Sequence, residues 1–240
     1  MNDIPSGEDK ISIVATEALN FLQSRLLPSI QYTLLDIGCG DGRDINHLSS
    51  NFANLILGGI DISSDAIDQA NVLNSSKENI TFECMDWKAL DDTQYDIVYM
   101  SGVYHFFPLA DRRAFISKVK KILKPEGYFI MSTLSSNDTQ YYGKGEPVVG
   151  DPNSFEGEYF IHFSSEEELR EDFKFLRIVN LFEYFHKNYA HDTEYHTMWM
   201  LFGENISEGF LSSQWTFQKL WGLSIYYINR AFFLEYNKKK

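Results

Sequence analysis

One stretch decides the fold of this chain: Leu34-Leu35-Asp36-Ile37-Gly38-Cys39-Gly40-Asp41-Gly42-Arg43. It begins inside the apolar run 32–37, which is short and ends in glycines and therefore predicts a buried β-strand. The closely spaced glycines let the backbone turn tightly and let a ligand approach it. A dinucleotide-binding loop would need a third glycine at the position of Arg43, so a nicotinamide-binding protein is disfavoured.

The rest of the chain repeats this strand pattern. Helical spacing of apolar residues predicts helices beside and between the strands, over 11–27, 64–74 and 111–123. Strands that alternate with helices predict a doubly wound α/β fold, in which a mostly parallel sheet is covered on both faces. Two longer runs near the C-terminus predict an antiparallel hairpin. The further strands are expected over 55–60, 80–84, 95–100, 127–133, 175–186 and 194–202.

The pattern Asp36-x-Gly38-x-Gly40-x-Gly42 resembles motif I of the class I S-adenosylmethionine (SAM) methyltransferases. Asp61 strengthens the resemblance, because it stands 25 residues beyond Asp36 at the end of the second strand. Asp86 after the third strand, the segment 100–106 and the turn 123–128 match the family in the same order. The resemblance covers residues 30–203 and implies a Rossmann-like seven-stranded sheet, SAM as cofactor and methyl transfer to an acceptor.

The resemblance also assigns residues to the cofactor. Asp61 is expected to bind the ribose hydroxyls, because a carboxylate can accept two hydrogen bonds from a diol. Asp86 is expected to meet the adenine amine, with Trp87 lying against the ring. Cys39 is expected to be an inert small residue of the loop. The cofactor-binding set is Asp36, Gly38, Cys39, Gly40, Asp61, Ile62, Asp86, Trp87, Met100 and Ser101.

His105 is the candidate catalytic residue. Displacement at an activated methyl group mainly requires orientation, which can supply about 7–11 kcal/mol, and a general base can add a factor of about 10²–10⁴. His105 stands at the strand end that faces the methyl group in the family, and histidine exchanges protons near neutral pH. The alternative is that His105 only lines the pocket or bonds to backbone. Tyr104 is expected to orient the acceptor or contact the sulfonium, with packing as the alternative.

Residues 134–165 are expected to form an insert that selects the acceptor. Glycines and aromatic side chains suit a mobile cover over a small organic molecule. Its candidate substrate-binding residues are Tyr141, Tyr142 and His162. A similar insert occurs in small-molecule members, including those related to tellurite-resistance methyltransferases. The run 164–167 is expected to begin a helix with a capping acid.

No metal site is expected. Histidines 162, 186, 191 and 196 lie in the last third, but spacings of five place neighbours on opposite strand faces. No cysteine or close acidic cluster completes a site. Asn137-Asp138 resembles the magnesium ligands of catechol-type O-methyltransferases, yet Ser101 stands where those enzymes place an acid. The Asn-Pro-Pro-Tyr sequence of amide-methylating enzymes is also missing after the fourth strand, so protein glutamine and adenine bases are disfavoured as acceptors.

The composition of the chain disfavours several classes of binding partner and cellular location. The chain of 240 residues carries 21 Lys+Arg and 34 Asp+Glu, a formal net charge of −13, which argues against nucleic acid as a substrate. No run approaches about 20 apolar residues, so no membrane span is expected. The acidic N-terminus does not resemble a signal peptide. Two cysteines give no disulfide framework, and a cytoplasmic location is expected.

We expect two parts in the chain: a methyltransferase domain over 1–203 and a helical extension over 204–240. The extension is rich in apolar residues and is expected to pack on the domain, with a homodimer contact or a lid over the acceptor site as the next alternatives and a membrane-surface helix as the last. The predicted function is transfer of the methyl group of SAM to a small-molecule acceptor. The alternative is a regulatory or scaffold protein that binds SAM without turnover.

Overall fold

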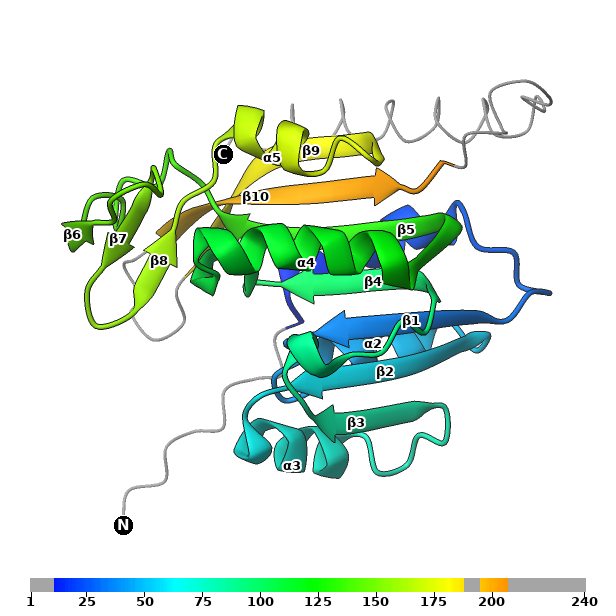
Figure 1. The fold of residues 1–240 in the computed structure, drawn as a ribbon. Helices are drawn as coiled ribbons and strands as arrows, with labels where there is room; N and C mark the ends of the chain where they lie inside the picture. The colour runs from blue at the N-terminus through cyan, green and yellow to red at the C-terminus, as the bar shows by residue number, and fades with distance from the viewer. Residues whose placement is uncertain (1–10, 188–194, 207–240) are drawn as a thin grey trace, which may run out of the picture. The chain divides into compact units, whose positions relative to one another are not determined.

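Residues 11–187 and 195–206 are described by the computed structural model, and their centre is a seven-stranded sheet (Figure 1). The strand order is β3-β2-β1-β4-β5-β10-β9. The first five strands run parallel, and β10 runs antiparallel to both of its neighbours. The predicted mostly parallel sheet with a C-terminal hairpin is therefore confirmed. The strands are β1 Tyr32–Ile37, β2 Leu55–Asp61, β3 Ile80–Cys84, β4 Tyr95–Ser101, β5 Leu123–Leu134, β9 Arg177–Lys187 and β10 Tyr195–Glu204.

Helices cover both faces of this sheet. They are α1 Ile13–Gln23, α2 Arg43–Asn51, α3 Ser64–Leu73, α4 Leu109–Ile122 and α5 Glu166–Asp172, with the short turns η1 Trp87–Ala89 and η2 Tyr104–Phe106. Leu34 packs with residues of α1, α2 and α3, whereas its neighbour Leu35 packs with residues of α4 and α5. Burial on both faces explains why β1 reads as a continuous apolar run.

Two helices begin at residues other than those predicted, because of their caps. Ser12 caps α1, since its hydroxyl accepts the Ala15 N–H, and the helix therefore begins after it rather than at residue 11. The same helix ends at Gln23, four residues before the predicted end at 27. Pro28 disfavours helical backbone at residue 27, because its ring crowds the residue before it. In contrast, α4 begins at Leu109, two residues earlier than predicted, and its first N–H donates to Asp151.

Strand β5 begins at Leu123, four residues before the predicted start. Leu123 pairs with Tyr95, and the register shifts before Ile97 pairs with Tyr128. Glu126 takes a positive φ of 62° in this irregular stretch. The irregularity hid the strand start from the sequence pattern, because residues 124–126 are polar or proline and break the apolar run.

The insert between β5 and α5 contains a second sheet, which the sequence analysis did not predict. Its strands are β6 Glu146–Pro147, β7 Ser154–Glu156 and β8 Phe160–His162, in the antiparallel order β6-β7-β8. This small sheet lies near the C-terminal ends of the parallel strands (Figure 1). Strands of two or three residues are too short to show alternation in a sequence.

Within the described ranges, no helix has the length and apolar character needed to cross a membrane. The extension expected over 204–240 lies outside the described residues from 207 onward. His191, one of the four histidines of the last third, lies outside them as well.

Candidate cofactor and acceptor site

The glycine turn follows directly from β1. Gly38, Gly40 and Gly42 have φ angles of +77°, +53° and +73°, which glycine adopts far more readily than other residues. A Cβ at Gly38 would lie 2.3 Å from Val103 Cγ2, and one at Gly42 would lie 2.6 Å from the Phe82 ring. A Cβ at Gly40 would meet nothing within 4 Å. The turn is therefore packed on two sides and open at Gly40, where a ligand can approach the backbone.

Asp61 at the end of β2 lies against this open turn. Its Oδ2 accepts the Gly40 N–H at 2.9 Å, and its Oδ1 accepts the Ser63 N–H at 2.9 Å. The turn is further fixed by the Gly38 N–H, which donates to the Ile60 carbonyl at 2.8 Å. The structure thus brings together Asp61 and the glycine turn, which are far apart in the sequence.

Ile62 and Asp86 lie at the neighbouring strand ends. The Met85 N–H donates to the Asp61 carbonyl at 2.9 Å, which places Asp86 beside the end of β2. Asp86 is exposed and accepts the Lys88 N–H at 2.9 Å, so that it caps η1. The Ile62 side chain is 77% exposed. The ends of β2 and β3 therefore present an exposed carboxylate and an exposed apolar side chain close to Asp61.

Asp36 is a buried carboxylate without a full set of partners. Its Oδ1 has no hydrogen-bond partner among the described residues, and its side chain is almost fully buried. Burial, followed by the charges of Asp44 and Asp61, raises the pKa of Asp36 well above its usual value. Asp44 itself accepts the hydroxyls of Ser12 and Tyr99, each at 2.7 Å. A nearby cation would reduce the electrostatic repulsion within this group of acids.

The remaining predicted cofactor residues are mostly core residues. Burial, then the charge of Asp36, raises the pKa of the Cys39 thiol, which keeps it protonated and unreactive. Trp87 is buried, and its ring centre lies 5.3 Å from those of Phe107 and Phe115. Met100 is fully buried. Ser101 Oγ, half-buried at the end of β4, lies 3.5 Å from Ser132 Oγ.

The turn η2 after β4 carries Tyr104 and His105. Tyr104 is fully buried, and its hydroxyl donates to Asp172 at 2.9 Å. His105 is also buried, and its Nδ1 has no partner among the described residues. Burial, with smaller effects of His196 and His162, lowers the pKa of His105 to about 3. Its imidazole is therefore neutral at physiological pH.

A second histidine, His196 on β10, was not predicted as a site residue. Its Nδ1 lies 3.6 Å from Asp138 Oδ2, and its ring centre lies 4.7 Å from that of Tyr141. Asp138 is held rigidly, because it accepts the backbone N–H groups of Thr197, Gln140 and Tyr141. The partners Asp138 and Thr197 are 59 residues apart, so no local spacing could reveal the pair. The structure thus sets predicted Tyr141 beside an unpredicted carboxylate–histidine pair.

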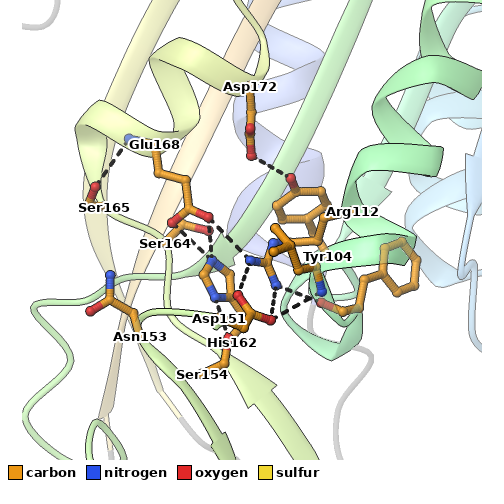
Figure 2. A network of polar contacts seen from close by, with 12 residues as sticks. Tyr104, Arg112, Asp151, Asn153, Ser154, His162, Ser164, Ser165, Glu168 and Asp172 are labelled. Carbon is orange, nitrogen blue, oxygen red and sulfur yellow. Dashed lines mark hydrogen bonds and ion pairs between the residues drawn. The ribbon is translucent and has the colours of Figure 1, made fainter. Parts of the chain in front are cut away.

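Tyr142 and His162 belong to the insert. The Tyr142 hydroxyl donates to Asn153 Oδ1 at 2.8 Å. His162 is fully buried, with Nδ1 2.9 Å from Ser154 Oγ and Nε2 3.0 Å from Glu168 Oε1 (Figure 2). Over the ranges that the structure covers, no group of three or more His, Cys, Asp or Glu side chains is arranged to hold a metal ion.

The fold and this site together define a class. The sheet order places β1 between β2 and β4, so that the chain reverses direction of winding at β1. In such α/β sheets, ligands bind at the C-terminal ends of the strands at this point. The glycine turn and Asp61 lie there. The chain is therefore a Rossmann-like protein, and the end of β1 is its candidate ligand site.

Sequence comparison agrees with this class. Residues 35–129 match the family model described as a methyltransferase domain. A malonyl-[acyl-carrier protein] O-methyltransferase 2 from Ilyobacter polytropus is 27% identical over 140 residues, which cover 58% of this chain and 52% of the relative. A ubiquinone biosynthesis O-methyltransferase from Coxiella burnetii is 27% identical over 141 residues, which cover 57% of this chain and 58% of the relative. The match thus spans about half the length of these curated relatives.

Solved structures share the fold. A SAM-dependent methyltransferase from Methanosarcina mazei has a TM-score of 0.66 and 20% identity, and the match covers 78% of this chain and 98% of that one. TehB from Haemophilus influenzae has a TM-score of 0.64 and 17% identity, and the match covers 83% of this chain and 64% of TehB. The N-methyltransferase NodS from Bradyrhizobium japonicum, solved with S-adenosylhomocysteine, has a TM-score of 0.61 and 17% identity. The match covers 86% of this chain and 94% of NodS.

Residues 35–129 thus match a methyltransferase domain, and the chain shares its fold with SAM-dependent methyltransferases, so SAM is the cofactor against which the site is compared. The residues present fit that cofactor. Gly40 leaves room beside the backbone, and Asp61 offers carboxylate oxygens at the same place. The buried Asp36 has an oxygen without a partner, which suits a ligand that carries positive charge.

Proposed function

We propose that this chain transfers the methyl group of SAM to a small-molecule acceptor by in-line displacement. The observation that carries the proposal is the contact of Asp61 with the open glycine turn, in which its carboxylate accepts the Gly40 and Ser63 N–H groups. When bound, SAM supplies a methyl group activated by its sulfonium charge. The chain's own residues then have to hold the cofactor, orient the acceptor and take its proton.

The proposed cofactor residues are the predicted set, centred on the glycine turn. Asp61 and Asp86 are proposed to bind the adenosyl group, because both carboxylates stand at adjoining strand ends. Asp36 is proposed to stabilise positive charge on the cofactor, since its own charge is poorly compensated. Ile62 is proposed to contact the ligand, because its apolar side chain is otherwise exposed. Cys39, Trp87, Met100 and Ser101 are proposed to form the wall behind these groups.

The acceptor is proposed to be a small molecule rather than nucleic acid. The net charge of −13 disfavours a polyanion, and the curated relatives named above include an O-methyltransferase of ubiquinone biosynthesis. Tyr141, Tyr142, His162 and Tyr104 are the proposed acceptor-side residues, of which Tyr141 lies beside His196.

Binding and turnover together test the proposal. SAM and S-adenosylhomocysteine are expected to bind in isothermal titration, and a low-molecular-mass cell extract is expected to raise the release of S-adenosylhomocysteine. Binding without any release would support the regulatory or scaffold alternative. No heat at millimolar SAM would contradict both functions.

Replacement of His105 by alanine is expected to lower turnover by about 10²–10⁴-fold if His105 accepts the proton of the acceptor. The dissociation constant of SAM should change less than about threefold, because the proposed role concerns the acceptor alone. Since the pKa of His105 is about 3, its imidazole stays neutral above pH 5 and adds no inflection to the rate there. Turnover measured from pH 5 to 8 checks this prediction.

The matched variant is His196→Ala. An inflection between pH 5 and 8 that is lost in His196→Ala and kept in His105→Ala would assign the base to His196. Unchanged turnover in His105→Ala would remove that residue from the mechanism.

The proposal includes a cytoplasmic location, supported by the free thiols of Cys39 and Cys84. It also includes the two domains 1–203 and 204–240. A homodimer contact through the second part is kept as the alternative to docking on the first. Sedimentation of the full chain measures which of the two occurs.

A further inference from the structure

A buried ionic cluster joins three separate parts of the chain (Figure 2). Its centre is Arg112 of α4, a fully buried side chain. The guanidinium donates to both carboxylate oxygens of Asp151, at 2.6 and 3.2 Å, and to the Phe107 carbonyl at 2.9 Å. It also lies 3.5 Å from Glu168 on α5. We call Arg112, Asp151, Glu168, His162 and Ser154 the Arg112 cluster.

Asp151 has a second role in this cluster. It accepts the Leu109 N–H at 3.1 Å and so caps α4, whose N-cap residue Pro108 has no side-chain acceptor. Burial acts to raise the pKa of Asp151, but the hydrogen bonds and charge of Arg112 outweigh it and keep that pKa below its usual value. The insert therefore supplies the cap of a helix that begins 42 residues earlier.

The cluster continues through His162 to α5. His162 Nε2 lies 3.0 Å from Glu168 Oε1, and its Nδ1 lies 2.9 Å from Ser154 Oγ, so the ring bridges α5 and the insert. A parallel contact links the same helix to η2, because the Tyr104 hydroxyl donates to Asp172. Every polar atom in these contacts belongs to η2, to Phe107 directly after it, to α4, to the insert or to α5. The contacts of Asp61, in contrast, run to Gly40 and Ser63.

A buried ion pair contributes little net stability compared with apolar side chains of the same volume, because desolvation offsets the attraction. What this cluster does supply is fixed geometry. Phe107 is the second residue after His105, and the insert that carries Asp151 also carries Tyr141. A single guanidinium thus holds the backbone near the candidate catalytic histidine and the candidate acceptor residues in one arrangement.

We propose that Arg112 is a positioning residue for the acceptor end of the site. It fixes η2 and the insert as one unit, so that its loss impairs use of the acceptor and leaves cofactor binding intact. This inference rests on the proposed methyl transfer, because it assigns the acceptor to the side of His105.

The test compares variants that separate positioning from folding. Arg112→Met leaves Asp151 buried without its partner and is expected to destabilise the chain. The double variant Arg112→Met/Asp151→Asn removes both charges, keeps an oxygen that can accept the Leu109 N–H and is expected to fold, but it cannot tie Phe107 to the insert. Arg112→Lys keeps the charge and loses the planar fork that reaches both partners. Arg113→Met is the matched control, because Arg113 is exposed on the same helix.

Three measurements follow on the double variant and on Arg112→Lys. The dissociation constant of S-adenosylhomocysteine, by titration, should stay within about threefold of the wild-type value. Hydrogen exchange should rise at least about tenfold in peptides over 104–109 and 147–163, and stay unchanged over 34–43. With the extract that supports wild-type turnover, kcat/KM for the acceptor should fall at least about tenfold while KM for SAM is unchanged.

Wild-type exchange at both segments in the folded double variant would overturn the proposal, as would full kcat/KM in that variant or an equal effect of Arg113→Met. A rise in exchange that includes 34–43 would also overturn it, since the cluster would then be a general stabilising element. If the wild-type chain binds SAM and releases no product, the proposed function fails, and the exchange data alone decide whether Arg112 joins η2 to the insert.

Discussion

Replacing Asp61 by alanine is expected to weaken SAM binding by about 10²–10⁴-fold. The carboxylate accepts the N–H groups of Gly40 and Ser63, so its loss frees the open glycine turn. Hydrogen bonds to a charged group contribute about 1.5–3 kcal/mol each. Loss of the two that Asp61 is expected to accept from the ribose hydroxyls accounts for this range of affinity. Titration with SAM measures the change.

Two controls define this prediction. Asp65→Ala removes the same charge from an exposed position in the first turn of α3 and should leave SAM binding within about twofold of wild type. Asp61→Asn keeps one acceptor oxygen and should give an intermediate loss. A dissociation constant for Asp61→Ala close to that of Asp65→Ala would remove Asp61 from the cofactor site.

Asp36→Asn is expected to stabilise the ligand-free chain at pH 7 and to weaken SAM binding. Burial and two neighbouring acids raise the pKa of Asp36 in the folded state, whereas an unfolded aspartate titrates near about 3.9. Below that pH the carboxyl is protonated in both states. As the pH rises from there to the raised pKa, the folded wild type loses stability by about 1.4 kcal/mol for each unit of the pKa difference.

Thermal melting from pH 4 to 8 checks the first half of this prediction. Wild type should lose stability relative to Asp36→Asn as the pH rises from 4 towards the raised pKa of Asp36, and the two should agree most closely at pH 4. Binding checks the second half: the variant should lose more affinity for SAM than for S-adenosylhomocysteine, which lacks the sulfonium charge. If the melting temperatures of wild type and Asp36→Asn changed in parallel with pH, and the variant lost equal affinity for SAM and S-adenosylhomocysteine, the charge of Asp36 would affect neither stability nor cofactor binding.

Much of the fold was predictable because the central strands are buried on both faces. Runs such as 32–37 and 95–100 had to be mostly apolar, and the structure has strands there. The insert was not predictable in the same way. Its strands pair over only two or three residues, and their apolar partners, such as Leu134 and Met198, come from other parts of the chain.

The cofactor end of the site could be predicted because the glycines and Asp61 occupy fixed positions after consecutive strands. The acceptor end could not. His196 on β10 lies near Asp138, which follows β5, and Arg112 on α4 binds Asp151 of the insert, so each pair depends on tertiary contacts. Tyr104 and Trp87 show the reverse problem. Both side chains are buried, and an aromatic residue beside a site has the same sequence pattern whether it faces a ligand or packs in the core.

The cap that Asp151 gives to α4 affects how the acceptor range of this chain can be engineered. Exchanging the insert for that of another methyltransferase would remove the cap together with the substrate-selecting residues. Arg112 would then stay behind as a buried cation. A graft should therefore carry an acid at the position of Asp151, or change Arg112 at the same time, before any new specificity can be judged.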